Sequence, residues 1–297
     1  MVILNWRTPE YTVRAARALM ADGVQPARLV IVDNGSGDGS VERFRRELTR
    51  CRILPLADNI GFARANNAGA RQLPGSQGYL FVNSDAFLHR PGTVSHLVEA
   101  LEDPNVGIVF PRLRNVDLST QRNVVPFSSP LPALVRASGL SRFVPNRIQP
   151  RLATHWDHST SRRIQAANGA VVLVRAAAWR QLGGFNEQTF MYVEDLDLCR
   201  RAAGLGWTAR FVAEAEFIHL GGASSAQRWG DAERAERMAR IEAELLGHYM
   251  GPARTRLTIA VMAAGVGVRA VWYRLRGNQE AATVQRAWLR GYLSPGR

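Results

Sequence analysis

Lysine is absent from this sequence, and all 38 of its basic residues are arginines. The absence excludes every mechanism that needs a lysine amine, including the phosphate-binding P-loop and Schiff-base chemistry. Cysteine is scarce as well. Cys51 and Cys199 both lie inside apolar patterns, so we expect two small core residues, a reducing compartment and no disulfide framework. No GxSxG nucleophile motif and no GxGxxG dinucleotide motif occurs.

The composition is that of a folded protein with an excess of positive charge. Its 297 residues are 46% hydrophobic, enough for a full core in one large domain or one domain with an appendage. An apolar run begins at Val2, so we expect no signal peptide and a cytoplasmic protein. The formal net charge of +13 suits nucleic acid, a membrane surface or an anionic substrate. Because no arginine-rich stripe is interleaved with aromatic residues, we expect no nucleic-acid partner.

Short apolar runs alternate with amphipathic stretches through the first 113 residues. This alternation predicts an α/β fold with a mostly parallel sheet flanked by helices, and ligands at the carboxyl ends of its strands. The predicted strands are residues 2–6, 28–34, 51–57, 79–85 and 106–113, and the predicted helices are residues 9–21, 40–50, 62–73 and 91–102.

The rest of the chain is predicted in three parts. Residues 114–163 have no sustained period, so we expect a variable excursion over one face of the sheet. Residues 230–249 alternate glutamate and arginine at helical spacing, which predicts a solvated helix. Between these two stretches we expect a second ordered block, made of strands at 164–175 and 207–219, a short helix to Leu182 and an acidic helix at 194–205.

Two predicted strands of the first block end in an aspartate. Asp33 is followed by three glycines in "VDNGSGDGS" (32–40), so we expect it to accept hydrogen bonds from a nucleobase or a ribose, with a plain turn as the alternative. Asp85 ends "NSD" (83–85), where one carboxylate can hold Mg²⁺ or Mn²⁺ on a substrate phosphate. His219 closes a late strand and either completes such a metal site or is structural.

The segment "FMYVEDLDLCRR" (190–201) places three carboxylates within four residues. The spacing i, i+3, i+7 predicts that Leu196, Cys199 and Ala203 form the buried face of a helix. Asp197 lies off that face near two arginines, so we expect a surface ion pair of about 0.2–0.5 kcal/mol.

Glu194 and Asp195 stand at the predicted start of the same helix. The positive end of the helix dipole stabilises a carboxylate there without any cation partner. These two carboxylates are therefore the ones available for chemistry, with helix capping as the alternative interpretation.

Seven motifs in order carry a resemblance to a known family. From residue 2 to about residue 225, the chain resembles the family-2 inverting glycosyltransferases, and within them the rhamnosyltransferase-like branch. Each motif alone is of moderate specificity, whereas their order together is a strong signal. The motifs are Asn5–Trp6, "VDNGSGDGS" (32–40), "NIGFARANNAG" (59–69), "NSDA" (83–86), "NGAVVLVRAAAWRQLGGFNE" (168–187), "YVEDLDLCRR" (192–201) and "HLGGAS" (219–224).

The resemblance implies a role for each matching residue. Asp33 would contact the base of a nucleotide-sugar, Asp85 would hold the divalent cation, Mg²⁺ or Mn²⁺, on its diphosphate, and Asp195 would be the general base. Glu194 is the next candidate for the base. The nucleotide-sugar site as a whole would comprise Asn5, Asp33, Asn34, Gly61, Arg64, Asn67, Asn83 and Asp85. The family often has Asp-x-Asp where this chain has Asn83-Ser84-Asp85, which makes His219 important as the second metal ligand.

The resemblance also implies a fold of the GT-A type and a division of the chain. Residues 1–225 would form the glycosyltransferase domain, with 1–113 as its nucleotide-sugar half and 164–225 as its acceptor and catalytic half, and 226–297 would be a helical appendage. The implied reaction is inverting transfer of a deoxyhexose, rhamnose from a deoxythymidine diphosphate donor, to a cell-envelope or lipid-linked glycan. A galactofuranosyl or other hexosyltransferase using a uridine diphosphate sugar would show the same motifs. A non-catalytic nucleotide-binding or glycan-binding protein is the third interpretation.

The tail carries the longest apolar run, "LTIAVMAAGVGVRAVWY" (257–273). It is shorter than the roughly 20 apolar residues that span a bilayer, and a buried core helix is one interpretation. Residues 251–297 hold eight arginines against one acid, Glu280, and Trp272 and Tyr273 suit the headgroup level. We therefore expect an interfacial helix that docks the protein on the inner face of the cell membrane.

Overall fold

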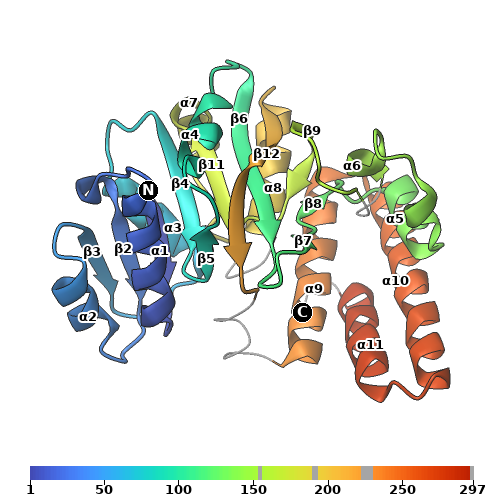
Figure 1. Cartoon of the computed structure of the whole chain (residues 1–297). Helices are drawn as coiled ribbons and strands as arrows, with labels where there is room; N and C mark the ends of the chain where they lie inside the picture. The colour runs from blue at the N-terminus through green and yellow to red at the C-terminus, as the bar shows by residue number, and fades with distance from the viewer. Residues whose placement is uncertain (153–155, 189–192, 222–229, 295–297) are drawn as a thin grey trace. The chain divides into compact units, whose positions relative to one another are not determined.

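The computed structural model describes residues 1–152, 156–188, 193–221 and 230–294. The chain divides into two compact units (Figure 1). The sheet unit comprises Met1–Val124 and Asp157–Ser224, and the helical unit comprises Val125–Trp156 and Ser225–Arg297. Most of the stretch that we expected over one face of the sheet is part of the helical unit. Its partners within that unit are helices more than 80 residues later in the sequence.

The elements follow the predicted order closely, with several short strands that the sequence did not indicate. The strands are β1 (Val2–Asn5), β2 (Val30–Asn34), β3 (Arg52–Leu56), β4 (Gly78–Asn83), β5 (Ala86–Leu88), β6 (Val106–Arg114), β7 (Thr120–Gln121), β8 (Val124–Val125), β9 (Arg162–Ile164), β10 (Ala166–Ala167), β11 (Val171–Arg175) and β12 (Thr208–His219). The helices are α1 (Pro9–Ala21), η1 (Pro26–Arg28), α2 (Ser40–Glu47), α3 (Phe62–Arg71), α4 (Thr93–Glu99), α5 (Pro130–Ala137), η2 (Leu140–Phe143), α6 (Gln149–Leu152), α7 (Ala176–Leu182), α8 (Glu194–Gly204), α9 (Asp231–Tyr249), α10 (Pro252–Leu275) and α11 (Gln279–Leu293).

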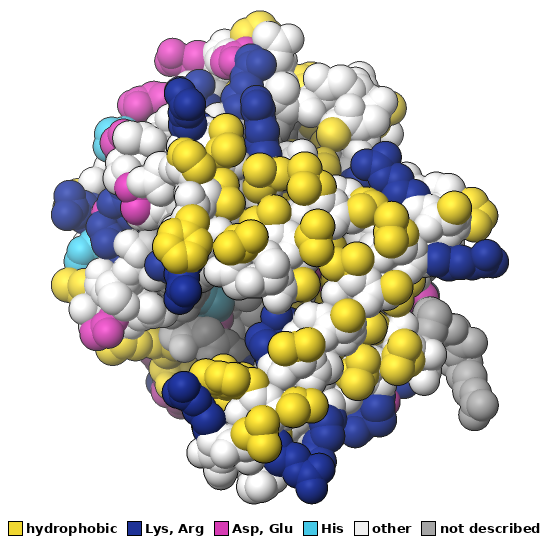
Figure 2. Space-filling model, turned by 90° about the vertical axis from the view of Figure 1, so that its right-hand side faces the viewer, with side chains coloured by type: hydrophobic (Ala, Val, Ile, Leu, Met, Phe, Trp, Pro, Cys, Tyr) yellow, Lys and Arg dark blue, Asp and Glu magenta, His cyan; other side chains and the backbone are white. Residues whose placement is uncertain are grey.

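The helical unit has a small core of its own. Helices α9, α10 and α11 pack against one another, and α5 packs against α10. Its buried residues include Ala239, Ala243, Leu246, Met262 and Val266. The prediction of a solvated helix at 230–249 was wrong for one face of α9. Alanines spaced by four residues line that face and are small enough for close packing. Because alanine is only weakly hydrophobic, the sequence pattern did not indicate a buried face. Figure 2 shows many hydrophobic side chains left on the surface of this part of the chain.

The sheet of the first unit has the strand order β3-β2-β1-β4-β11-β6-β12-β5. Strands β3, β2, β1 and β4 are parallel, as predicted. The second half is mixed, because β11 runs antiparallel between β4 and β6. The start of β11 therefore lies beside the carboxyl end of β4, where the Asn83 N–H donates to the Ala170 carbonyl at 2.8 Å. This arrangement brings later segments of the chain to the edge where the parallel strands end.

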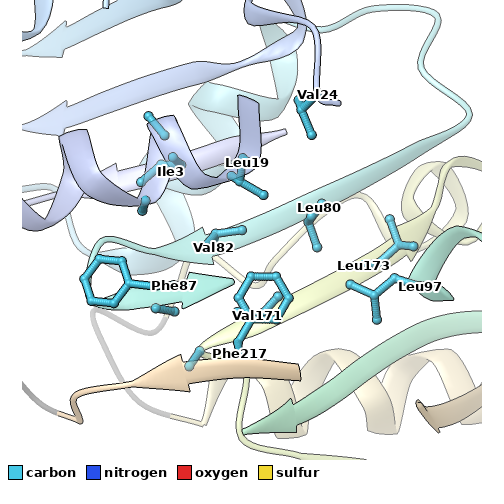
Figure 3. Close-up of a cluster of buried hydrophobic side chains, with 14 of the residues drawn as sticks. Ile3, Leu19, Val24, Leu80, Val82, Phe87, Leu97, Val171, Leu173 and Phe217 are labelled. Carbon is cyan, nitrogen blue, oxygen red and sulfur yellow. The ribbon is translucent and has the colours of Figure 1, made fainter. Parts of the chain in front are cut away.

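The main core lies between this sheet and helices α1, α2 and α4. Figure 3 shows Leu19 of α1 and Leu97 of α4 in the cluster with Val82 and Val171 of the central strands. Helix α3 covers the opposite face, where a Cβ on Gly69 would lie 2.5 Å from Val2 Cγ1, so only glycine allows this approach. The sheet is thus covered on both faces, as an α/β fold requires.

Helix α8 begins at Glu194 as predicted, but its buried face differs from the prediction. The side chains of Asp197, Leu198, Cys199 and Ala202 are buried, whereas Leu196 is partly exposed and Ala203 is exposed. Asp197 is therefore not a surface residue. It accepts a hydrogen bond from Arg201 Nε at 2.7 Å, which satisfies a carboxylate that the sequence pattern placed on the solvated side.

Candidate functional site

The carboxyl ends of β1, β2 and β4 are joined by a network of buried polar side chains. Asn5 Nδ2 donates to Asp33 Oδ1 at 2.7 Å and to Ser36 Oγ at 3.0 Å. Asn5 Oδ1 accepts from Thr8, and the Thr8 hydroxyl lies 2.8 Å from that of Ser84. Because all five residues are at most 3% exposed, the network fixes the three strand ends relative to one another.

Asp33 keeps some capacity for a ligand. Its Oδ1 accepts from Asn5 and from Ser36 Oγ, and its Oδ2 accepts from the Ser36 N–H at 3.1 Å. An ionised carboxylate has about four lone-pair sites, so three are used inside the protein. The remaining site on Oδ2 suits one further donor, such as a nucleobase N–H. Its assignment to the base remains a prediction.

Asn34 holds the next loop of the predicted site. Its Oδ1 accepts from the Ile60 N–H at 3.0 Å, and its Nδ2 donates to Asn59 Oδ1 at 3.1 Å. Asn59 Oδ1 in turn accepts from the Gly61 N–H at 3.1 Å. Gly61 has φ 88°, a region that favours glycine, and it precedes the start of α3. The end of β2 and the start of α3 therefore form one connected wall.

Arg64 and Asn67, on α3, contact a different segment. Both N–H groups of the Asn67 amide donate within the protein, to the Phe185 carbonyl at 3.0 Å and to Glu187 Oε1 at 2.9 Å. Arg64 Nε donates to the Glu187 carbonyl at 3.2 Å. Asn67 therefore positions residues 185–187, and a contact of either residue with a nucleotide-sugar remains a prediction.

Asp85 and His219 come together as predicted from the ends of two strands. β5 and β12 are antiparallel with Ala86 opposite His219, which brings His219 Nε2 to 3.4 Å from Asp85 Oδ1. Asp85 is 5% exposed. On the other side of the imidazole, Nδ1 lies 2.7 Å from Gln121 Oε1. The sequence analysis missed Gln121, because β7 is only two residues long and lies 98 residues before His219.

Asp85 and His219 together suit a hard divalent cation that also binds the phosphates of a substrate. A carboxylate oxygen and an imidazole nitrogen are ligands that Mn²⁺ and Mg²⁺ accept, and a diphosphate commonly supplies the others. Within the described ranges, no group of three or more His, Cys, Asp or Glu side chains converges as a metal site. Asp85 and His219 would therefore hold such an ion only together with other ligands. Asn83, at the end of β4, is partly exposed beside them.

Asp195 lies in the first turn of α8 and is held by main-chain amides. Its Oδ2 accepts from the Gly169 N–H, and its Oδ1 accepts from the Leu196 N–H at 2.9 Å. A Cβ on Gly169 would lie 3.1 Å from the Asp195 Cβ, a contact so tight that Asp195 would have to move by a few tenths of an ångström. Burial raises the pKa of the Asp195 carboxyl, and the main-chain hydrogen bonds oppose that rise. An aspartate with a raised pKa, and with no cationic side chain of the described residues on its carboxyl, is suited to accept a proton.

The residue before this turn is strained. Val193, the N-cap of α8, has φ 59° and ψ 7°, a left-handed conformation that β-branched residues rarely adopt. Such outliers cost of order 1–3 kcal/mol and gather at functional sites. Glu194, the alternative candidate for the base, follows directly and is 5% exposed. The strain therefore coincides with the two carboxylates that the sequence analysis singled out.

Main-chain contacts connect the two halves of the candidate site. The Gly169 N–H binds Asp195, and the next residue, Ala170, accepts from the N–H of Asn83 at the end of β4. Asp85 follows two residues later, beside His219. Thr8, Ser36 and Gly169 are contributors that the sequence analysis did not single out. Ser36 and Gly169 lie inside two of the family motifs quoted above, so their positions in those motifs could have indicated a role at the site.

Two solved structures with similar folds contain a bound nucleotide-sugar. A mannosyltransferase, PcManGT from Pyrobaculum calidifontis, in complex with GDP-Man and Mn²⁺, has a TM-score of 0.60 at 13% identity, covering 98% of this chain and 85% of that one. TarS 1-349 from S. aureus in complex with UDP-GlcNAc has a TM-score of 0.53 at 13% identity, covering 98% and 91%. At these identities the likeness concerns the fold alone, and it confirms the predicted GT-A type.

Sequence comparisons identify the family. The model for glycosyl transferase family 2 matches residues 2–157, and the model for glycosyl transferase family group 2 matches residues 152–288. A Mycobacterium tuberculosis protein named N-acetylglucosaminyl-diphospho-decaprenol L-rhamnosyltransferase is 30% identical over 214 residues, 66% of this chain and 67% of the relative. The low-salt glycan biosynthesis hexosyltransferase Agl10 of Haloferax volcanii is 26% identical over 184 residues, 59% of this chain and 53% of the relative. The chain therefore belongs to glycosyl transferase family 2 and is a glycosyltransferase.

Proposed function

We propose that the enzyme transfers rhamnose from dTDP-rhamnose, with inversion, to a lipid-linked cell-envelope glycan. The observation that carries the reaction type is Asp195, a carboxylate with a raised pKa on the same sheet edge as the Asp85–His219 pair. The donor and acceptor are supported by the mycobacterial relative, whose name specifies an L-rhamnosyltransferase acting on a lipid-linked diphosphate sugar.

In the proposed reaction, Asp195 takes the proton from an acceptor hydroxyl as its oxygen attacks the anomeric carbon of the sugar. The new glycosidic bond forms while the bond between that carbon and the diphosphate oxygen breaks, and the nucleoside diphosphate departs with the electron pair. A base at the start of α8 also benefits from the helix dipole, which stabilises the carboxylate before the proton arrives. A positioned general base contributes about 10²–10⁴-fold to such a step.

The leaving diphosphate gains negative charge, and Asp85 with His219 would hold a divalent cation against it. Bound there, Mn²⁺ or Mg²⁺ would supply charge neutralisation to the leaving group. The Mn²⁺ in the complex of the mannosyltransferase supports this choice of cation. Asp33 would receive the base, Asn5, Asn34, Gly61 and Asn83 would form the walls around the nucleotide, and Arg64 and Asn67 would lie on the sugar side.

The donor is tested with a panel of nucleotide-sugars, measuring both hydrolysis and transfer. We expect turnover with dTDP-rhamnose and at least tenfold less with UDP-hexoses. The haloarchaeal hexosyltransferase relative makes a UDP-sugar the competing candidate, and turnover only with a UDP-sugar would overturn the rhamnose assignment. Donor binding without any turnover would favour the non-catalytic interpretation, which the loss of one Asp-x-Asp carboxylate supports.

We also propose a division of labour along the chain. Residues 1–113 would bind the donor, residues 164–225 would carry the base and receive the acceptor, and the C-terminal region 226–297 would associate with the inner face of the cell membrane. The last assignment rests on α10, the one helix of the described chain that is long and apolar enough to cross a membrane, with a mean hydropathy of 1.2 in its best window.

Helix α10 has two apolar faces, one buried in the helical unit and one exposed. One face, with Met262 and Val266, is buried in the core of the helical unit, which is the observation that favours a core helix. On the other face Leu257, Val268 and Val271 are exposed, the last two by 69% and 60%. Arg269, which interrupts the apolar run, donates to Gln285 Oε1 of α11 at 3.1 Å and so leaves the exposed face apolar.

Charge on the same unit favours an anionic membrane as the partner. Helix α10 contains four arginines and no acid, and residues 125–156 likewise contain four arginines and no acid. That second stretch also exposes large side chains, Leu131 and Leu134 on α5, the helix that packs against α10, and Phe143 on η2. Each basic residue near an anionic leaflet contributes about 1 kcal/mol.

Membrane docking is tested by co-sedimentation with vesicles of phosphatidylglycerol and phosphatidylcholine. The double substitution Val268→Glu and Val271→Glu should reduce binding at least tenfold without changing donor hydrolysis. Val98→Glu is the matched control, because Val98 is 53% exposed on α4 of the sheet unit. Equal binding of the double variant and the wild type would overturn the docking proposal. Truncation before α10 is a poor test, because it would also remove half of the core of the helical unit.

A further inference from the structure

A chain of hydrogen-bonded side chains runs from exposed Asp117 to His219. Gln121 is the last side chain before His219. Ser119 Oγ donates to Asp117 Oδ1 at 2.6 Å, and Asn115 Nδ2 donates to Ser119 Oγ at 2.8 Å. Gln121 Nε2 donates to Asn115 Oδ1 at 3.0 Å, and Gln121 Oε1 lies 2.7 Å from His219 Nδ1. The first four residues belong to the turn between β6 and β7 and to β7 itself.

The direction of this chain is fixed at both ends by groups that only accept hydrogen bonds. The ionised Asp117 carboxylate must receive the single Ser119 proton, so the Ser119 oxygen accepts from the Asn115 amide. Asn115 then offers its carbonyl oxygen to Gln121, which must donate. Independently, Gln121 Nε2 also donates to the main-chain carbonyl of His219 at 3.2 Å. Both arguments therefore place the oxygen of the Gln121 amide against Nδ1 of the His219 ring.

The orientation of Gln121 determines where the imidazole of His219 carries its proton. Because Gln121 Oε1 is an acceptor, His219 must donate from Nδ1. In the neutral ring the lone pair then lies on Nε2, 3.4 Å from Asp85 Oδ1. Two acceptors that face each other repel, unless a metal ion, a proton or a water that donates to both joins them. Histidine ligands are commonly oriented by a hydrogen bond on the second ring nitrogen.

We propose that Gln121 is a positioning residue that fixes the Nδ1–H tautomer of His219 and so directs Nε2 toward a divalent cation shared with Asp85. This inference rests on the proposed function, because a cation on the donor diphosphate is part of that reaction. Gln121 itself touches neither the cation nor the substrate. Its role is distinct from packing because a carboxylate at this position would preserve it and an apolar side chain would not.

The tautomer is tested without any metal by NMR of protein with ¹⁵N-labelled histidine. The spectrum contains six histidines, and the signals of His219 are assigned by their loss in His219→Ala. At a pH where the ring is neutral, the wild type should show a protonated Nδ1 and an unprotonated Nε2. The Nε2–H tautomer in the wild type would overturn the inference.

The effect on the cation is tested by EPR titration of Mn²⁺ in the presence of dTDP. Gln121→Leu should weaken Mn²⁺ binding about 10–100-fold, the range seen for outer-shell partners of metal ligands. Gln121→Glu should restore part of the affinity, because a carboxylate also accepts from Nδ1–H, although it cannot donate to Asn115 and to the His219 carbonyl as the amide does. Gln72→Leu, at an exposed position after α3, is the matched control and should bind Mn²⁺ as the wild type does.

The outcomes separate this inference from the proposed function. Wild-type Mn²⁺ affinity in a folded Gln121→Leu protein would overturn the positioning role and leave the proposed function intact. No Mn²⁺ binding by the wild type would overturn both the proposed cation and the role of Gln121 toward it. Equal weakening by leucine and glutamate would show that Gln121 only packs, which also overturns the inference.

Discussion

Asp85, which is buried, and Asp195, which is partly buried, lie on the same edge of the sheet, and their surroundings differ. Asp85 faces the imidazole of His219, a group that can share a cation with it. Within the described part of the chain, Asp195 receives hydrogen bonds only from the main-chain amides of Gly169 and Leu196, and burial raises its pKa. The first environment suits a metal ligand, and the second suits a group that accepts a proton.

This difference matches the two charges that move in sugar transfer. Negative charge grows on the leaving diphosphate, and a proton leaves the acceptor hydroxyl. A third carboxylate, Asp197, lies in the same helix as Asp195 and has a structural environment. It is 2% exposed and is paired with Arg201, whose guanidinium also donates to the Leu182 and Gly184 carbonyls. Asp197 is thus held by a fixed arginine, whereas Asp195 is held by main-chain amides.

Apart from substitution of the base itself, the largest effect is expected from removal of the cation proposed at Asp85. Excess EDTA should lower transfer by about 10³-fold or more, because the leaving group then departs without charge neutralisation. Added Mn²⁺ or Mg²⁺ should restore the rate, as measured with radiolabelled donor. Full activity in excess chelator would remove Asp85 and His219 from the roles proposed for them.

A change beside Asp195 should have the next largest effect. Gly169→Ala places a Cβ 3.1 Å from the Asp195 Cβ and 3.4 Å from its Oδ2, so the carboxylate must shift. We expect kcat to fall about 10–100-fold, since misplacement of a reacting group by about 1 Å can cost 10²-fold. Donor KM should change little.

The control for that variant is Gly204→Ala at the end of α8. A Cβ on Gly204 meets no atom within 4 Å, so this substitution should leave kcat unchanged. Equal activity of Gly169→Ala and Gly204→Ala would indicate that the position of Asp195 does not limit the reaction.

Substitution of the structural carboxylate should affect stability instead of turnover. Asp197→Asn removes a buried, charge-assisted hydrogen bond, which should lower the free energy of unfolding by about 1.5–3 kcal/mol. Urea denaturation measures this change, and kcat per folded molecule should stay within about twofold of the wild type. A large loss of kcat in a stable Asp197→Asn protein would move the catalytic role toward Asp197.

The smallest effect at neutral pH is the dependence of the rate on the protonation of Asp195. Burial places its pKa above the ordinary value of 3.8, and only the ionised form can take a proton. The acidic limb of kcat/KM should therefore fall at a higher pH than an ordinary aspartate would give, with activity lost as pH decreases through the raised pKa. A rate that stays constant down to pH 4 would contradict a base with a raised pKa.

Residues at strand ends could be predicted because their neighbours in sequence determine their positions. Asp33 and Asp85 each follow an apolar run, and the carboxyl ends of β2 and β4 meet at one edge through the parallel register of the sheet. The strand β12 likewise brings His219 to Asp85, although the sequence alone only made that pairing one of two alternatives.

Other features depended on contacts between distant segments. Nothing near Gln121 in the sequence indicates that its amide reaches His219. The buried face of α8 was misjudged because Asp197 is neutralised by Arg201, so a charged residue can lie inside while Leu196 is partly exposed. The place of residues 125–156 in the helical unit depends on packing of α5 against α10, which no local pattern shows.

The central claim is that Asp195 is the general base while Asp85 serves the leaving group. The most direct measurement compares donor binding and transfer in Asp195→Asn, with Glu194→Gln in parallel. We predict that Asp195→Asn binds dTDP-rhamnose with wild-type affinity and loses about 10²–10⁴-fold in kcat, because asparagine keeps the shape and removes the basicity. Unchanged kcat in Asp195→Asn, with a comparable loss in Glu194→Gln, would contradict the account and assign the base to Glu194.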